Sequence, residues 1–136
     1  MAADKASKAE KSRRILVALE QLHRVEQWKM ADLERRLAEL EQEKVELISA
    51  LNDNEALHGL FIDATARRLS STAEVAERVA RAKEEQALKL REYAARVKIS
   101  ERLTSQHEQE AAREREAKEL LDVVEQTVNT KLTSLP

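Results

Sequence analysis

Residues 51–62 read LNDNEALHGLFI and decide the fold, because they hold the only glycine, Gly59, close to three short polar residues, Asn52-Asp53-Asn54. Short polar side chains compete for backbone hydrogen bonds and favour caps and turns. Glycine weakens a helix by about 1 kcal/mol relative to alanine. The single proline is Pro136. A long helix is therefore expected to turn back at this stretch.

The composition is that of a long coiled coil. The chain has 136 residues, of which 37% are charged and 2% aromatic, and Ala, Glu, Lys, Leu and Arg dominate. A net charge of −2, with acids and bases intermixed, offers no basic stripe for nucleic acid. There is no cysteine, which excludes disulfides and thiolate sites. The longest apolar run, Ile15–Leu19, is too short for membrane insertion, so a cytoplasmic, soluble, all-α protein is expected.

Before the central stretch, apolar residues recur at alternating steps of three and four, which is a period of 3.5 and predicts a left-handed supercoil with another helix. Three members are polar, and such residues commonly set register or oligomeric state, or extend their ends to solvent. We call this set the first-helix stripe: Leu16, Leu19, His23, Glu26, Met30, Leu33, Leu37, Leu40, Lys44, Leu47 and Leu51.

After the central stretch a second set has the same spacing, with an alanine at every seventh residue, and small residues let a partner helix approach closely. This second-helix stripe comprises Ile62, Ala66, Leu69, Ala73, Ala76, Ala80, Lys83, Ala87, Leu90, Ala94 and Val97. Both stripes span 36 residues. Folding back would pair Leu51 with Ile62 and Leu16 with Val97, whose numbers both add to 113. This predicts a long antiparallel two-helix coiled-coil hairpin with its turn at about 52–61.

The expected organisation is a single hairpin domain over residues 1–136. The first helix is expected at about 8–52, since Ser7 and Glu10 have capping-box spacing, and the second at about 60–132. Ser70–Thr72 is interpreted as the interior of a continuing helix, with a cap as the alternative. Leu57, Leu60, Phe61 and Ile62 are expected to close the end of the hairpin, with contact to a partner as the alternative.

Beyond residue 113 the hairpin leaves the second helix without a partner. There an amphipathic segment carries the C-terminal stripe: Leu120, Leu121, Val124, Val128, Leu132 and Leu135. An apolar face of this kind is a candidate docking or self-association surface. The alternative is a different register that packs it on the first helix near Ile15.

Trp28 falls at heptad position f, which faces away from the stripe. Tryptophan is enriched at interface hot spots, so Trp28 joins the C-terminal stripe as a candidate partner-binding residue. The alternative is that its ring lies over neighbouring Lys and Arg side chains.

Two Glu-x-x-His pairs, Glu20/His23 and Glu55/His58, resemble the pairs of di-metal bundles. They lie 35 residues apart, about 52 Å along a helix, so they cannot converge in one hairpin. No metal ligands, cofactor site or catalytic residues are expected, and the chain is not expected to be an enzyme.

Three segments carry a resemblance to a known family: residues 15–40, Arg96-Val97-Lys98-Ile99-Ser100-Glu101-Arg102-Leu103, and residues 114–122. In these segments and in its two-helix layout the chain resembles FliJ-type proteins, small bacterial components of flagellar and other type III export systems. It departs from them after Asp122, where Val123-Val124 follows and members often carry an Asp-Glu pair.

The resemblance implies a coiled coil similar to the central stalk of rotary ATPases. Such a stalk would sit in the ring of the export ATPase, contact the membrane export gate and handle substrate chaperones, in the cytoplasm or at the periphery of the membrane export apparatus. The alternative function is a generic cytoplasmic scaffold or dimerisation protein, including a homodimer. The stalk is expected to be largely monomeric, and the scaffold to form a concentration-dependent oligomer.

Overall fold

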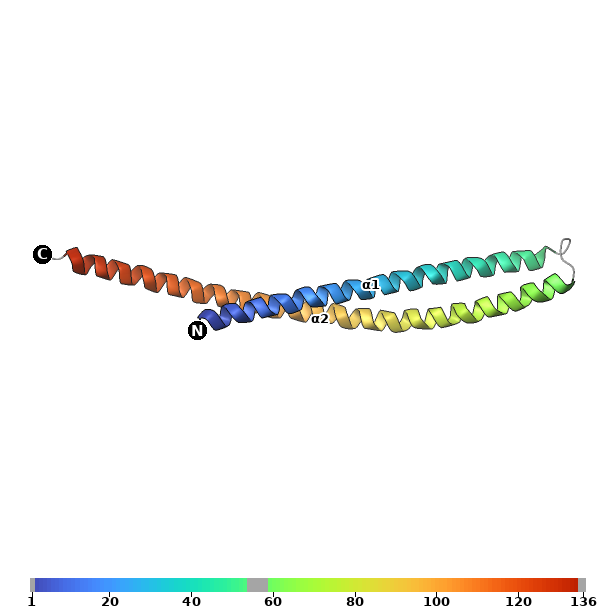
Figure 1. The fold of residues 1–136 in the computed structure, drawn as a ribbon, viewed down its shortest axis with the longest axis horizontal. Helices are drawn as coiled ribbons and strands as arrows, with labels where there is room; N and C mark the ends of the chain where they lie inside the picture. Colours follow the sequence, from blue (N-terminus) through green and yellow to red (C-terminus); the bar gives the residue numbers. More distant parts are fainter. Residues whose placement is uncertain (1, 54–58, 135–136) are drawn as a thin grey trace. The chain divides into compact units, whose positions relative to one another are not determined.

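The chain forms two helices that pack against each other. The computed structural model describes residues 2–53 and 59–134, without the side chains of residues 2, 3 and 60. Helix α1 spans Ala2–Asn52 and helix α2 spans Gly59–Ser134 (Figure 1). The described residues contain no strand, so the expected all-α class with two packed helices is confirmed.

Helix α1 begins earlier than expected, at Ala2 instead of about residue 8. The Ser7–Glu10 pair lies inside the helix and does not cap it. Residues 2–8 contain alanine and lysine, which are good helix formers, and no glycine or proline. Asp4 in the first turn also complements the helix dipole. The spacing of a capping box was therefore a misleading signal.

The other helix ends lie close to their expected positions. Helix α1 ends at Asn52, where the Asp53 amide donates to the Ser49 carbonyl at 3.2 Å. Helix α2 begins at Gly59, runs unbroken through Ser70–Thr72, and ends at Ser134 instead of 132. Leu57, within residues 54–58, and the side chain of Leu60 lie outside the described residues, whereas Phe61 and Ile62 are exposed.

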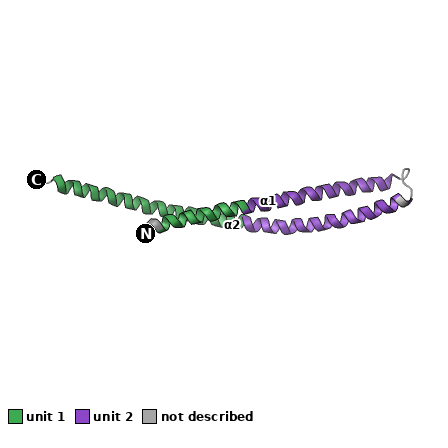
Figure 2. Cartoon of the chain, viewed as in Figure 1, with its two compact units in different colours: residues 1–21, 94–136 green, residues 22–93 purple. Residues whose placement is uncertain are grey.

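Two compact units divide the chain (Figure 2). Unit 1 comprises residues 1–21 and 94–136, and unit 2 comprises residues 22–93. Each unit contains part of α1 and part of α2. The expectation of one domain stays a prediction.

The first-helix stripe is confirmed, because all eleven members are buried or half-buried. Among the described side chains of α1, the only others that are not exposed are Ala9, Ser12 and Glu43. Ala9 and Ser12 continue the three-four spacing towards the N-terminus. The most buried member is Leu16, in unit 1, at 5% exposure.

Nine of the eleven members of the second-helix stripe are buried or half-buried, and Ile62 and Ala66 are exposed. The second-helix stripe is therefore confirmed from Leu69 to Val97 and wrong at its first two members. A more buried row lies one residue before the row of alanines, at Thr72, Val79 and Gln86 in unit 2 and at Ser100 in unit 1. The two rows differ by about 100° around the helix, and the more buried row contains polar residues that an apolar pattern does not detect.

Candidate interaction surfaces

A buried polar layer joins the helices of unit 2. Gln86 Nε2 donates to the Glu26 carbonyl at 2.9 Å and also to the Glu26 carboxylate. Lys29 Nζ lies 3.2 Å from the other carboxylate oxygen. Glu26 and Gln86 are 8% and 6% exposed. Both buried groups therefore have partners, which is the condition under which a polar layer is tolerated in a core.

The hydrogen bond from Gln86 lowers the pKa of Glu26 below its ordinary value of 4.5. Burial opposes this shift in the pKa, whereas the Lys29 hydrogen bond and the charges of Lys29 and Lys89 add to it. The carboxylate of Glu26 is thus held ionised inside the helix pair.

Unit 1 has a second polar layer. Ser12 Oγ and His107 Nδ1 are hydrogen-bonded, and Arg13 lies 3.8 Å from Glu108 across the exposed edge. Thr104 is the most buried side chain of the described chain, at 2% exposure, and its hydroxyl has no hydrogen-bond partner. Small polar residues, Ser100 and Thr104, therefore occupy inward positions of α2 in unit 1.

Gln86, Thr72, Ser100 and Thr104 were missed by the sequence analysis, because none of them is apolar. A signal for them does exist. Steps of three and four from Leu69, Ala76, Lys83 and Leu90 lead to Thr72, Val79, Gln86, Ser100 and Thr104. The three-four spacing alone, without regard to hydropathy, therefore predicts the buried face of α2.

Trp28 lies on the outer face of unit 2, with 65% of its surface exposed. This agrees with heptad position f. The neighbouring Lys29 is paired with Glu26. Whether Trp28 binds a partner stays a prediction.

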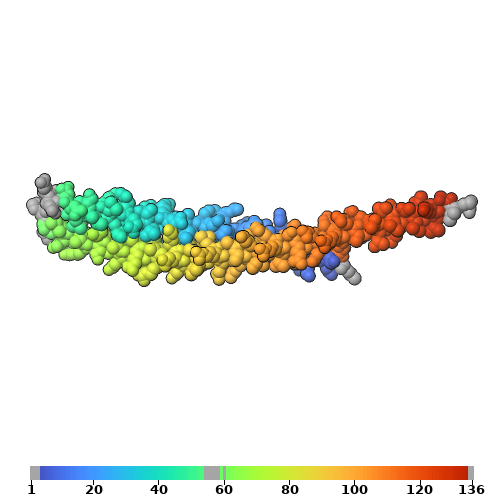
Figure 3. All heavy atoms as spheres, turned by 180° about the vertical axis from the view of Figure 1, so that it is seen from behind, coloured from blue at the N-terminus to red at the C-terminus, as the bar shows by residue number. Residues whose placement is uncertain are grey.

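The C-terminal stripe is exposed along its described length. Every residue from 115 to 134 is exposed, and Figures 1 and 3 show no other described segment of unit 1 beside this part of α2. Leu120, Leu121 and Leu132 are more than 60% exposed, and Val124 and Val128 about half. Leu135 lies outside the described residues. The stripe therefore does not pack on α1 near Ile15 in unit 1, and that alternative is wrong.

The described hydroxyl groups near the end of this segment are hydrogen-bonded within the helix itself. The hydroxyls of Thr127, Thr130 and Thr133 donate to carbonyls four residues earlier, at 2.9, 2.7 and 3.0 Å. The hydroxyl of Ser134 donates to the Lys131 carbonyl. These hydroxyl groups therefore have their hydrogen bonds within the helix, and the apolar side chains of the segment face solvent.

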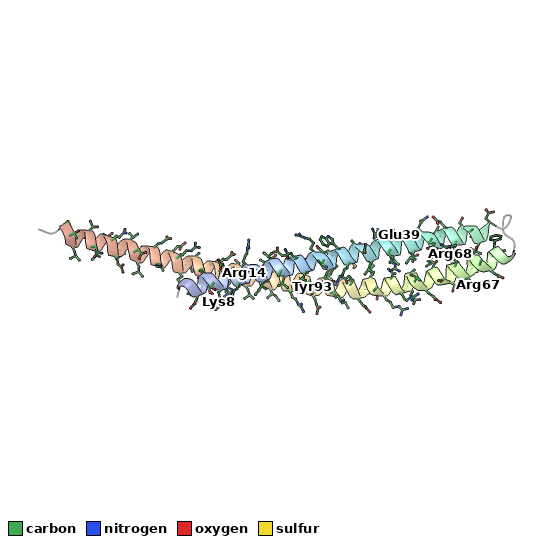
Figure 4. The ribbon with its side chains drawn as sticks, viewed as in Figure 1. Lys8, Arg14, Glu39, Arg67, Arg68 and Tyr93 are labelled. Carbon is green, nitrogen blue, oxygen red and sulfur yellow. The ribbon has the colours of Figure 1, made fainter. Side chains whose placement is uncertain are left out.

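A charged groove lies between the helices of unit 2. Arg68 of α2 pairs with Glu43 of α1 at 3.0 Å, and both line this groove together with Glu39. Glu39 and Arg68 are labelled in Figure 4. Charged pairs at such exposed positions contribute little to stability. The groove is a solvated edge of the helix pair.

The described residues contain no group of three or more His, Asp or Glu side chains placed to hold a metal ion. His23 is half-buried on the first-helix stripe, and the Glu55/His58 pair lies outside the described residues. No described helix has the length and apolar character of a membrane span.

Comparison with known proteins finds no matching family model, no matching curated protein and no matching solved structure.

Proposed function

We propose that this chain is a non-enzymatic coiled-coil stalk or adaptor of a flagellar or type III protein-export ATPase complex. The observation that carries the proposal is the exposed C-terminal stripe, which continues α2 for 20 residues beyond the last half-buried position, Glu114. A helix pair with a free apolar helical end suits a protein that inserts into, or docks on, a larger assembly.

In this proposal α1 and α2 form an antiparallel, left-handed coiled coil. Two features support it. The inward positions of both helices recur at alternating steps of three and four. The cross-helix contacts of unit 2 join Glu26 to Gln86 and Glu43 to Arg68, so the partner number falls as the α1 number rises.

The function would be mechanical. The stalk contacts the export ATPase ring, the membrane export gate and substrate chaperones through side chains on its surface, with Trp28 and the C-terminal stripe as the leading candidates. It carries no chemistry of its own and acts in the cytoplasm or at the periphery of the membrane export apparatus. Coupling of this kind requires contacts that differ between states of the ring.

The test is retention of the full chain by a purified, immobilised export ATPase. Trp28→Ala and Leu121→Asp are expected to reduce retention at least tenfold. The matched controls are Val45→Ala and Leu88→Asp, because Val45 and Leu88 are 59% and 62% exposed, close to Trp28 at 65% and Leu121 at 61%. Failure to retain the wild-type chain would remove the proposal. Equal losses in the controls would remove these residues as the contact sites.

The exposed stripe also favours the alternative function, a scaffold that self-associates. That function predicts a molecular mass that rises with concentration and falls to one chain in Leu121→Asp, with no effect on an export ATPase. Sedimentation equilibrium measures the mass directly. A constant single-chain mass excludes this alternative.

A further inference from the structure

A groove runs along one edge of unit 2, between α1 and α2. Two neighbouring hollows of this edge share Leu33 and Arg36. The charged groove beside the Glu43–Arg68 pair continues them, because Glu43 lies seven residues after Arg36 and Arg68 lies seven residues before Val75. Residues seven apart lie within about 20° of each other around a helix. We call these three hollows together the edge groove.

The two ends of the edge groove differ in charge. At one end, Arg36 of α1 and Arg78 of α2 line the same hollow, and neither arginine has an ion-pair partner among the described residues. At the other end, Glu39 and Glu46 line the groove, and they too lack an ion-pair partner in the part of the chain that the structure describes. The edge groove therefore offers two unpaired cations at one end and two unpaired anions at the other.

The floor of the basic end is apolar. Leu33, Val75 and Ala82 are half-buried there, and Val79 is buried. Apolar contact provides affinity at such a surface, and charge complementarity provides specificity and orientation. Apolar side chains beside two unpaired arginines suit an amphipathic helix that carries carboxylates next to its apolar face.

The C-terminal segment of this chain, residues 115–134, is a helix of that kind. Leu121 and Val128 of its apolar stripe are exposed. Glu125 lies one turn after Leu121 and one turn before Val128, and Asp122 lies one turn before Glu125. Neither carboxylate has an ion-pair partner among the described residues. The segment therefore has both the apolar face and the free acids that the groove requires.

The segment and the edge groove also match in length. The groove extends from Lys29 to Glu46 of α1, which is 18 residues and about 26 Å of helix. The exposed segment has 20 residues and is about 29 Å long. The segment can therefore contact both ends of the groove at once.

The spacing of the charges selects one direction. Lys131 follows the midpoint of Asp122 and Glu125 by about seven residues, and the midpoint of the two groove glutamates follows Arg36 by about the same number. When the segment runs parallel to α1 with its two acids beside Arg36, Lys131 therefore comes level with the acidic end. In the opposite direction Lys131 would come level with Lys29, and like charges would repel.

From this match we propose that the edge groove of one chain holds the C-terminal segment of a second copy, parallel to α1. Leu121 of the segment then lies level with Leu33, over the apolar floor. The same chain does not supply the segment, because residues 115–134 continue α2 without a break and cannot turn back onto the groove of the same helix. Each copy has one groove and one segment, so two copies can satisfy each other in a closed dimer.

This pairing does not need the proposed function. It covers Leu121, which the proposed function offers to an export ATPase, so the two contacts compete for the same surface. Retention by the ATPase and association of the chain with itself are separate measurements, and either can fail without the other.

Sedimentation equilibrium of the full chain tests the pairing. The wild-type mass is expected to rise from one chain, 15.5 kDa, towards two chains over a hundredfold range of concentration. A groove variant, Arg36→Glu with Arg78→Glu, and a segment variant, Asp122→Lys with Glu125→Lys, are each expected to weaken this association at least tenfold. A constant single-chain mass of the wild type overturns the proposal, and so does wild-type association of either variant.

A matched control separates the groove from a general effect of charge. Arg67→Glu with Arg91→Glu makes the same change in net charge at two exposed positions of α2 that do not line the edge groove. This control is expected to associate like the wild type. A loss equal to that of the groove variant overturns the assignment of the groove. Circular dichroism checks that every variant retains its helix content.

A mixture of the groove variant and the segment variant tests whether these charges meet. In a mixed dimer the unchanged groove of one chain holds the unchanged segment of the other, and the two reversed surfaces again have opposite charges. The mixture is therefore expected to associate at least tenfold more tightly than either variant alone. A mixture that associates no better than its components overturns the proposal.

Discussion

At the scale of single residues, the core is thin and its polar members matter as much as its apolar ones. Among the described residues of unit 1, Leu16 is the one large apolar side chain that is buried, and the buried residues of α2 in the same unit, Ser100 and Thr104, are small and polar. Stability in such a helix pair depends on a few positions. Adjacent residues on one helix should therefore differ sharply in their tolerance of substitution.

Leu16 and Ile15 provide a matched pair for this difference, because they are 5% and 57% exposed. Leu16→Ala is expected to destabilise the chain by about 2–3 kcal/mol through lost burial and a residual cavity. Ile15→Ala is expected to change stability by less than about 0.5 kcal/mol. Urea unfolding followed by circular dichroism measures both. Equal effects would mean that α1 does not present the first-helix stripe to α2.

Thr104→Val replaces an unsatisfied hydroxyl with a methyl group of similar size. Because the Thr104 oxygen is buried without a partner, the change is expected to raise the free energy of unfolding by about 1 kcal/mol. Thr127→Val is the control, since that hydroxyl is exposed and bonded to its own helix. A loss of stability in Thr104→Val would show that the hydroxyl has a partner in solution.

Glu26 makes stability depend on pH in the acidic range. Its folded-state pKa lies below the ordinary 4.5, mainly because of the Gln86 hydrogen bond. The stabilisation is therefore fully present above about pH 4.5 and is lost as the pH falls through the lowered pKa. Thermal melts at several pH values should show this loss in the wild type and in Glu39→Gln, an exposed control, but not in Glu26→Gln. An unchanged profile in Glu26→Gln would contradict this assignment.

At the scale of helices, α2 has a packed part and an unpacked part within one continuous helix. Helicity of an isolated helix depends on its length, and most helical stability in proteins comes from tertiary packing. The residues from 115 to 134 are all exposed, and no other described segment of unit 1 lies against them. They therefore depend on helix propagation from the packed part.

Amides of residues 118–134 are accordingly expected to exchange with deuterium at least a hundredfold faster than those of residues 72–100. The reason is that opening of this segment breaks no cross-helix contact. Hydrogen exchange with peptide-level mass spectrometry makes the comparison within one sample. Equal protection in a dilute sample would mean that another surface covers the C-terminal stripe, and the Leu121→Asp variant would then lose that protection.

At the scale of the whole molecule, the two inward faces belong to the same chain. A melting temperature that depends on concentration is the signature of association between chains. The melting temperature of Leu121→Asp, in which the exposed stripe carries a charge, is therefore expected to stay constant over a hundredfold range of concentration. A steady rise with concentration would mean that α1 and α2 pair between chains instead of within one.

The sequence by itself determined the helices, the end of α1 and both ends of α2 to within two residues, and the whole first-helix stripe, whereas the start of α1 lies six residues before the expected one. These follow from local signals: apolar residues at a helical period, and a polar stretch with glycine where α1 ends. In α1 the leucines contrast strongly with their charged neighbours, so the inward face is unambiguous.

Only the tertiary structure decided which row of α2 is most deeply buried and which residues of the two helices meet. Alanines in α2 give little contrast between two rows about 100° apart, and Thr72 and Gln86 turn inward despite their polarity because α1 covers them and, for Gln86, supplies acceptors. Periodicity is unchanged by a shift of seven residues, so it cannot select the register. Contacts such as Glu26–Gln86 and Ser12–His107 select it, and they exist only once the helices are packed.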